Sequence, residues 1–380
     1  MRVGVNLLFL EPGEVGGSEP LLTNLVRAVA AGDSGHDFVV FAVKGFGRAY
    51  PEIRDTTELV EAPWPSPPKG KQGVRIAAEH SWLPIEARRR HLDVIHHGVG
   101  TTPFLKPLPT VVTIHDVQYL HYPDNFTTLK RTWLRLNVPQ AARRSDIVSV
   151  TSRFVERDIA EGYGVDRSHI AIVPFGSERL FGPDPETQEN VRQRYRLDRP
   201  YLIFPGRSYP HKNHRMLIEA FAPLADQADL VLTGPRWFLD PEIAAAARNL
   251  GIMGTVRHLG LVPRRDLAGL YEGAVALAYP SRFEGFGAPV LEAWSVGCPV
   301  LSSNAAALPE VVGDAGILLE PDDLEGWTET MGNVLANPGL RDELAALGTK
   351  RAAEFTWERS AEAQVEAYER AAAFGVTEEP

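Results

Sequence analysis

The sequence predicts an α/β protein with two doubly wound domains, each built on a parallel sheet. Short apolar runs alternate with longer amphipathic stretches, as they do in βαβ units. The alternation starts near residue 3 and starts again at Tyr201, after a stretch rich in Pro, Gly and charged residues. The chain has 380 residues, which is more than one ordinary hydrophobic core contains, so two domains are expected.

In the first half, apolar runs are expected to be strands and amphipathic stretches to be helices. The expected strands are Val3–Phe9, Phe38–Val43, Val94–His96, Val111–Ile114 and Ile147–Val150. The expected helices are Leu21–Ala31, Lys130–Arg143 and Ser152–Tyr163, the last with Ser152 as its N-cap. Residues 62–73 are too rich in Pro for regular structure and are expected to form a surface loop.

The same pattern continues through the second half. The expected strands are Tyr201–Phe204, Leu230–Thr233, Val256–Leu259, Ala274–Tyr279, Val300–Leu301 and Gly316–Leu319. The expected helices are His214–Leu224, Pro241–Leu250, Arg265–Tyr271 and Trp357–Ala373. A further helix is expected to start near Pro289 and to stop at Gly297.

Composition and charge exclude several classes of protein. The net charge of −10 argues against general nucleic-acid binding. Cys298 is the one cysteine, so no intrachain disulfide can form, and a cytoplasmic location is expected. The apolar start of the chain is expected to be a strand and not a secretion signal. No apolar run approaches the ~20 residues that a membrane helix needs.

The most informative stretch runs from Pro280 to Val300 and carries two carboxylates, Glu284 and Glu292. A buried strand is expected before it, then a glycine-rich turn, then a helix. Unpaired backbone N–H groups and the positive end of the helix dipole would form an anion site between the two glutamates. Such a site suits a ligand that is both polyhydroxylated and phosphorylated, as a nucleotide sugar is.

Two cations follow another expected strand, in the run Gly206-Arg207-Ser-Tyr-Pro-His-Lys212-Asn213. Ligands of parallel α/β domains bind at the carboxyl ends of the strands, where this run lies. A guanidinium fork and an ammonium together suit a diphosphate. Taken alone, the run is better explained as a loop with solvated cations; beside the Glu284 turn, a functional role is favoured.

The first half offers weaker signals. Gly16 and Gly17 follow the first strand but lack the spacing of a dinucleotide-binding fingerprint. His115 and Asp116 end an expected strand, where a loop-orienting role and a functional role are equally compatible with the sequence. There is no Asp-x-Asp triplet and no His/Cys cluster with zinc spacing, so neither a metal nor another cofactor is expected.

These residues resemble the retaining GT-B glycosyltransferases of family 4. The run Glu284-Gly-Phe-Gly-Ala-Pro-Val-Leu-Glu292 resembles the family's E-x7-E signature, and Gly206 to Asn213 resembles its G-R-x4-K-N run. The segments 256–260, 299–310 and 355–357 also resemble family segments. The glycine pair and the His-Asp pair are similar to the family's N-terminal site residues.

The resemblance implies a role for each candidate. Glu292 would bind the ribose hydroxyls and Glu284 the hydroxyls of the donor sugar. Arg207 and Lys212 would neutralise the leaving diphosphate. The other implied contacts are Gly16 and Gly17 with the donor, His115 and Asp116 with the sugar and the acceptor, His258 and Leu259 with the base, and backbone N–H groups of Phe286, Gly287 and Ala288 with the diphosphate or the sugar.

The resemblance also implies the domain organisation and the reaction. Two Rossmann-like domains, 1–178 and 199–357, would face a cleft and be joined by a linker, 179–198. The last helix, about 358–380, would pack back on the first domain. The implied activity is the metal-independent, retaining transfer of a sugar from a nucleotide-diphosphate sugar to a hydroxyl acceptor, with GDP-mannose favoured over a UDP-sugar. The acceptor could be a glycan, a lipid-linked molecule or a small molecule.

Two other functions remain open at the level of sequence. A GT-B nucleotide-sugar epimerase or phosphorylase could use the same residues, and so could a non-catalytic protein that binds sugar nucleotides. Basic residues gather at Arg88–Arg90 and between Lys130 and Arg144, with Trp133 among them. This cluster would suit peripheral contact with the inner membrane face, although a solvated helix face explains it more simply.

Overall fold

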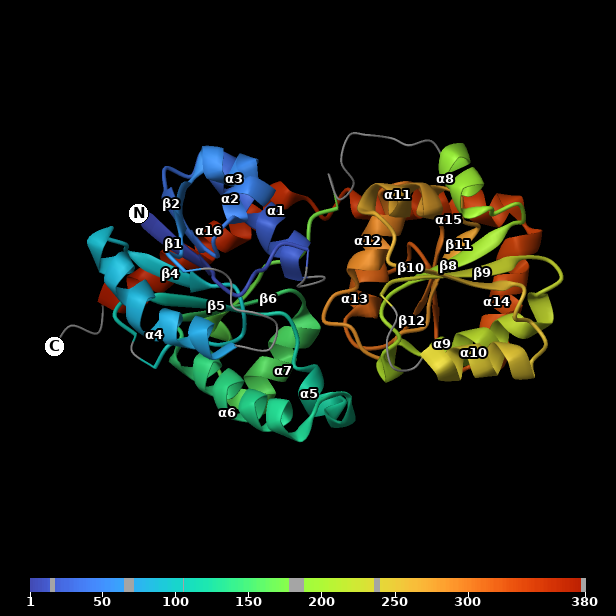
Figure 1. Cartoon of the computed structure of the whole chain (residues 1–380), viewed down its shortest axis with the longest axis horizontal. Coiled ribbons are helices and arrows are strands. Elements are labelled where there is room, and N and C mark those ends of the chain that lie inside the picture. Colours follow the sequence, from blue (N-terminus) through green and yellow to red (C-terminus); the bar gives the residue numbers. More distant parts are fainter. Residues whose placement is uncertain (14–17, 65–71, 105, 178–187, 236–239, 377–380) are drawn as a thin grey trace. The chain divides into compact units, whose positions relative to one another are not determined.

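A computed structural model describes residues 1–13, 18–64, 72–104, 106–177, 188–235 and 240–376. The chain forms two α/β units, each with its own parallel sheet (Figure 1). The first unit comprises Met1–Phe175 and Trp357–Pro380, and the second comprises Gly176–Thr356. The predicted fold class, two doubly wound parallel-sheet domains, is confirmed.

The sheet of the N-terminal unit has seven parallel strands in the order β3-β2-β1-β4-β5-β6-β7. These strands are β1 (Arg2–Leu7), β2 (Asp37–Ala42), β3 (Glu58–Glu61), β4 (Val94–His97), β5 (Thr110–Ile114), β6 (Ile147–Val150) and β7 (Ile170–Ile172). The order reverses between β1 and β4, which is the switch point where ligands bind in open parallel sheets.

Helices cover both faces of this sheet (Figure 1). They are α1 (Ser18–Ala31), α2 (Phe46–Ala49), α3 (Pro51–Thr56), α4 (Gln72–Arg89), α5 (Gln118–His121), α6 (Thr128–Arg144), α7 (Arg153–Tyr163) and α16 (Trp357–Val376). The predicted N-cap is confirmed, because the Ser152 hydroxyl accepts a hydrogen bond from the Val155 N–H.

Helix α16 belongs to the N-terminal unit although it is last in the chain. It packs against α1 and across the strands from β4 to β7. Buried polar groups fix its position: His96 Nδ1 lies 2.9 Å from the Tyr368 hydroxyl, and the Ser149 hydroxyl donates to Gln364 Oε1. Burial lowers the pKa of His96 to about 3, so this imidazole is neutral in the folded chain.

The sheet of the C-terminal unit has six parallel strands in the order β10-β9-β8-β11-β12-β13. They are β8 (Tyr201–Pro205), β9 (Asp229–Thr233), β10 (Val256–Gly260), β11 (Ala276–Tyr279), β12 (Val300–Ser303) and β13 (Ile317–Leu319). The order reverses between β8 and β11, which are paired through Ala276 with Leu202 and Leu277 with Ile203. The second switch point therefore lies at the carboxyl ends of β8 and β11.

The helices of this unit again follow the strands. They are α8 (Gln188–Tyr195), α9 (His214–Phe221), α10 (Asp240–Asn249), α11 (Arg264–Glu272), α12 (Ala288–Trp294), α13 (Leu308–Val312), α14 (Leu324–Ala336) and α15 (Pro338–Ala352). Pro289 lies in the first turn of α12, as predicted, because its missing N–H costs nothing there.

Two local expectations differ from the structure. The stretch expected to be a linker, 179–198, contains α8, which packs on α11 with Val191 fully buried against Gly269. The loop expected at 62–73 is shorter at its end, because α4 begins at Gln72; residues 65–71 lie outside the described part. Helix α8 is mostly polar and is held by the packing of Val191, whereas α4 buries Ala78, Leu83 and Ala87 in the core of the N-terminal unit.

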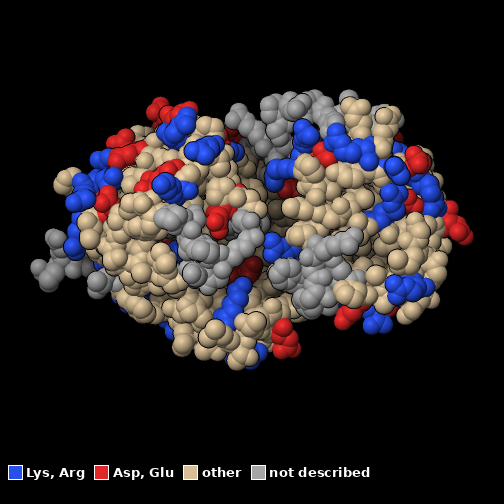
Figure 2. Space-filling view, viewed as in Figure 1, with Lys and Arg blue, Asp and Glu red and all other residues tan. Residues whose placement is uncertain are grey.

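On the face drawn in Figure 2, acidic and basic side chains are interspersed over both units. Within the described ranges, no helix combines the length and the apolar character that a membrane span requires.

Candidate functional site

The loops that leave β8 and β11 meet through a salt bridge between Lys212 and Glu284. The Lys212 ammonium donates to Glu284 Oε1 at 2.6 Å and to the Tyr279 hydroxyl at 3.1 Å. Only 15% of the Lys212 side chain and 14% of the Glu284 side chain are exposed. Two residues that are 72 positions apart in the chain are therefore fixed at the switch point of the C-terminal sheet.

The pair keeps the Glu284 carboxyl charged despite its burial. Burial acts to raise the pKa of the Glu284 carboxyl, but the Lys212 charge and the hydrogen bond from Lys212 outweigh it and hold the pKa below its usual value. Burial, together with Lys212, lowers the pKa of His211 to about 4, so that ring is neutral. A mostly buried charge pair of this kind is costly to break, because the remaining charge has no compensation.

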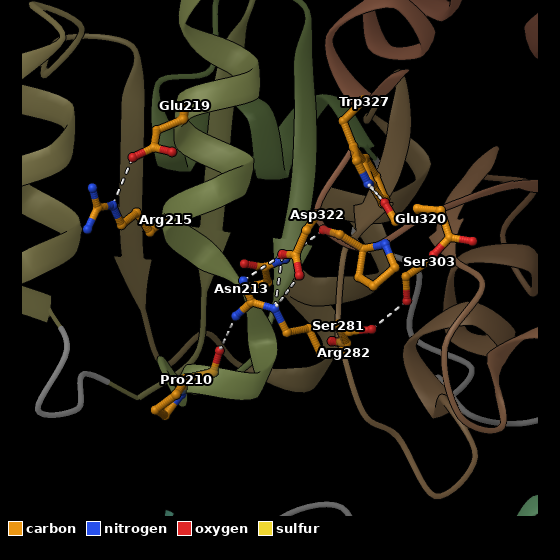
Figure 3. A network of polar contacts seen from close by, with 11 residues as sticks. Pro210, Asn213, Arg215, Glu219, Ser281, Arg282, Ser303, Glu320, Asp322 and Trp327 are labelled. Carbon is orange, nitrogen blue, oxygen red and sulfur yellow. Dashed lines mark hydrogen bonds and ion pairs between the residues drawn. The ribbon is translucent and has the colours of Figure 1, made fainter. Parts of the chain in front are cut away.

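A second ion pair holds the loop that carries Lys212 (Figure 3). Arg282 Nη2 donates to Asp322 Oδ1 at 2.6 Å, and Arg282 Nε donates to the same carboxylate. The Asn213 amide also donates to Asp322 Oδ1, at 3.1 Å, and to the Pro321 carbonyl at 2.7 Å. We call Asn213, Arg282 and Asp322 the latch.

The latch also binds the backbone carbonyls of the two residues that precede Lys212. Arg282 Nη1 donates to the Pro210 carbonyl, and the Arg282 backbone N–H donates to the His211 carbonyl at 2.7 Å. Asn213 has a φ of 60°, a left-handed conformation that few residues except Gly and Asn adopt readily. The latch therefore ties the loops after β8, β11 and β13 together around the ammonium.

Two glycines allow a close approach of backbone at this edge. Gly287 has a φ of 105°, and a Cβ there would lie 2.6 Å from Leu308 Cδ2. Gly234, after β9, has a φ of 128°, and its Cβ would lie 2.5 Å from the Gly206 carbonyl oxygen. Any side chain would push these turns apart, so both positions require glycine.

Glu292 lies on α12 and has other partners than Glu284. The Tyr271 hydroxyl donates to Glu292 Oε2 at 3.2 Å, and Arg264 Nη2 lies 3.7 Å from Glu292 Oε1. Both partners come from α11. Burial, followed by the Glu292 charge, raises the pKa of Tyr271 well above its usual value, so the hydroxyl keeps its proton and stays a donor.

The remaining predicted residues of this unit lie on the same loops or on the edge strand. Arg207 is half-buried in the turn after β8. Phe286 points its ring into the protein, where it contacts Phe355 at 5.8 Å between centroids, so only its backbone could meet a ligand. Ala288 is the first residue of α12. His258 and Leu259 are half-buried on β10, the edge strand.

In the N-terminal unit, His115 directly follows β5. Burial lowers its pKa to about 4, against a hydrogen bond with the backbone of Gly98. Its Nε2 atom is buried and has no hydrogen-bond partner in the described part of the chain. Since buried polar atoms are normally satisfied, a ligand hydroxyl would suit this nitrogen.

Asp116 is exposed, and its carboxylate accepts a hydrogen bond from the Gln118 N–H at the start of α5. Gly16 and Gly17 lie outside the described residues. Among the residues that are described, no group of three or more His, Cys, Asp or Glu side chains could hold a metal ion.

The sequence did not reveal three side chains that hold Lys212 and its loop in place. Tyr279, Arg282 and Asp322 each contact Lys212 or its loop. Tyr279 ends an expected strand and could have been suspected from that position. Arg282 and Asp322 carried no such signal, because their partnership depends on two loops meeting in space.

The chain matches known families over most of its length. Residues 199–337 match the family described as Glycosyl transferases group 1, and residues 15–177 match Glycosyltransferase Family 4.

Named relatives and solved structures show the same likeness. O-antigen chain mannosyltransferase B of Escherichia coli is 29% identical over 288 residues, covering 74% of this chain and 76% of that protein. A D-inositol 3-phosphate glycosyltransferase of Xylanimonas cellulosilytica is 31% identical over 244 residues, covering 61% and 58%. The structure of Anabaena Alr3699/HepE in complex with UDP-glucose has a TM-score of 0.74 at 18% identity, over 96% of this chain and 98% of that chain.

Proposed function

The chain belongs to glycosyltransferase family 4, and on that premise we propose that it is a retaining mannosyltransferase that moves mannose from GDP-mannose to a hydroxyl group. As a family member it is an enzyme that takes its sugar from a nucleotide sugar. We assign donor binding to the C-terminal unit and acceptor binding to the N-terminal unit.

The observation that carries the proposal is the fixed Lys212 ammonium at the β8/β11 switch point. When the glycosidic bond of the donor breaks, negative charge grows on the leaving diphosphate. Lys212 and Arg207 would stabilise that charge without having to reorganise, and preorganised charge stabilisation of this kind commonly contributes most to the rate enhancement of an enzyme. Glu284 would hold Lys212 on one side and meet sugar hydroxyls on the other.

Positive charge grows at the same time on the anomeric carbon, which becomes oxocarbenium-like. We propose that the acceptor hydroxyl attacks from the face that the diphosphate leaves, and that a leaving phosphate oxygen takes its proton. The anomeric configuration is then retained without a covalent sugar–protein bond. Mass spectrometry of digested enzyme after incubation with donor checks this step, since a trapped glycosyl-peptide would overturn it.

The choice of GDP-mannose rests on relatives. O-antigen chain mannosyltransferase B of Escherichia coli and O-antigen chain mannosyltransferase RfbU of Salmonella typhimurium are 29% and 28% identical to this chain over the matched segments. The base itself would meet the edge strand β10 near His258 and Leu259, mainly through backbone, so a UDP-sugar is the second donor to test.

The acceptor would be a glycan, a lipid-linked molecule or a small molecule that presents a hydroxyl near His115. Its neutral imidazole could accept a hydrogen bond from a hydroxyl of sugar or acceptor through Nε2. The D-inositol 3-phosphate glycosyltransferase relative supports a phosphorylated polyol as a further acceptor class.

A thermal-shift screen over nucleotide sugars tests the donor. A ligand at ~100 times its dissociation constant adds roughly 2.7 kcal/mol of stability, so GDP-mannose should raise the melting temperature more than UDP-glucose does. NMR of the product's anomeric proton then tests retention. Incubation with donor alone separates transfer from epimerisation, because only an epimerase converts the donor without an acceptor.

A further inference from the structure

We propose that α6 is a membrane-docking surface that seats the enzyme on anionic phospholipid, so that its acceptor is anchored in that bilayer. The proposal deepens the proposed function, on which it rests for the role of the acceptor side. Its basis is a helix face that is both apolar and basic in a protein whose net charge is −10.

The outer face of α6 carries large apolar side chains that the unit does not cover. Leu129 is 83% exposed and Leu136 is 67% exposed. They lie two turns apart on one side of the 17-residue helix, with the half-buried Trp133 between them. The opposite side of the helix holds Val138 and Ala142, which are buried in the core of the unit.

The charge of α6 is entirely positive. Its sequence contains no Asp or Glu, and its basic residues are Lys130, Arg131, Arg135, Arg143 and Arg144. Lys130 and Arg135 lie on the two flanks of the leucine face, by the periodicity of the helix. An apolar face with cations along its borders is the pattern of helices that lie in the interface of an anionic bilayer.

Neighbouring carboxylates do not cancel this charge. Asp146, which follows the helix, is nearly buried and is bound by Lys106 at 2.6 Å and by the Thr110 N–H. Asp158 on α7 accepts from His121 Nε2 at 2.7 Å. The exposed acidic residue nearest along the chain is Asp124, in the turn before the helix.

The position of α6 connects this surface to the reaction. The helix packs beside α5 and α7 (Figure 1), and α5 directly follows the His115-Asp116 pair. Leu120 on α5 is also exposed. A bilayer bound along α6 would therefore present hydroxyls of lipid-linked molecules close to the acceptor-side histidine.

Vesicle co-sedimentation of the full chain tests the surface. Vesicles of phosphatidylcholine with phosphatidylglycerol should bind the wild type, and vesicles of phosphatidylcholine alone should bind it weakly. The double variant Leu129→Glu/Leu136→Glu should partition at least about tenfold less, because it loses apolar burial and gains repulsion. Raising the salt from 0.15 M to 1 M, which shortens the Debye length from ~8 Å to ~3 Å, should also release the wild type.

The matched control is Leu250→Glu/Leu347→Glu, which replaces two exposed leucines of the C-terminal unit with the same charges. It should sediment like the wild type. Equal sedimentation of wild type and the α6 variant would overturn the proposal. So would light scattering that shows a dimer of the wild type and a monomer of the α6 variant, since the face would then bind a second copy.

The same variants separate this surface from the donor site. The α6 variant should keep the wild-type thermal shift with GDP-mannose and the wild-type rate on a detergent-dispersed acceptor. Its rate on acceptor embedded in anionic vesicles should fall at least about tenfold, in line with its binding. If GDP-mannose does not bind, only the donor assignment is refuted. If the α6 variant binds vesicles as well as the wild type does, only the docking surface is refuted.

Discussion

Lys212 and Glu284 form a 2.6 Å ion pair that joins the loops after β8 and β11, and the Tyr279 hydroxyl accepts a second hydrogen bond from the same ammonium. This contact gives the switch point a fixed positive group with one carboxylate beside it. Each part of that arrangement should have its own measurable effect on binding, turnover or stability.

Lys212→Ala should lower kcat by ~100- to 1,000-fold, the usual loss when one positioned donor leaves such a site. The same change should reduce the free energy of unfolding by about 3–5 kcal/mol, because Glu284 would remain as a buried, uncompensated charge. Adding Glu284→Gln should restore much of the stability but not the rate. Lys350→Ala, an exposed lysine on α15, is the control; near-normal turnover of Lys212→Ala would refute the assignment.

The two glutamates should separate nucleotide binding from sugar binding. Glu292→Gln should weaken GDP and GDP-mannose equally, since it would remove a contact to the ribose that both ligands share. Glu284→Gln should leave GDP affinity unchanged and weaken only the sugar nucleotide. Both should also lower turnover. Isothermal titration calorimetry with the two ligands measures the difference. A loss of GDP affinity in Glu284→Gln would contradict the proposal that Glu284 contacts only the sugar.

Arg282→Ala should reduce kcat by roughly ten- to a hundredfold with little change in the KM for donor, because the latch positions Lys212 and does not touch the ligand. Arg282→Lys should rescue part of the loss, and Asp322→Asn should resemble Arg282→Ala. Their effects should not add in the double variant. The control is Arg215→Ala, which breaks the exposed Arg215–Glu219 pair on the neighbouring helix α9 (Figure 3). Additive effects would show that the two residues act separately.

Stability should fall as the pH drops from about 6.5 toward 4. Burial lowers the pKa of His97 to about 3 and that of His115 to about 4, so the folded chain keeps these rings neutral while the unfolded chain takes up protons below about pH 6.5. Each such histidine contributes up to about 1.4 kcal/mol per pH unit in that window. Urea unfolding at several pH values measures the slope. His97→Asn should make the free energy of unfolding depend less on pH, and the control His91→Asn, at an exposed position, should leave that dependence unchanged. The same slope in His97→Asn and the wild type would contradict the role given to His97.

The sequence was sufficient to predict the fold class, because the periodicity of apolar residues and the glycine turns act locally. It also placed Lys212 and Glu284 at the ends of the right strands. The sequence did not predict the strands β3 and β7 or the helices α2, α3, α4, α5, α8, α13, α14 and α15. The two strands are short, and α8 is mostly polar and owes its structure to neighbours, as Val191 does to Gly269. The sequence missed the latch because Arg282 and Asp322 meet only after two loops have folded.

The different partners of Glu284 and Glu292 also became clear only from the structure. Their spacing in the motif suggested one shared site, but Glu284 is bound by Lys212 while Glu292 is bound by Tyr271 of α11. No local pattern distinguishes these partners, since both come from segments remote in sequence.

The thermal shift that GDP-mannose causes in the wild type and in Lys212→Ala tests the central claim most directly. If the Lys212–Glu284 pair holds the donor, a saturating concentration should raise the melting temperature of the wild type clearly and that of the variant far less. The same shift in both proteins would contradict the claim that this pair binds the nucleotide sugar.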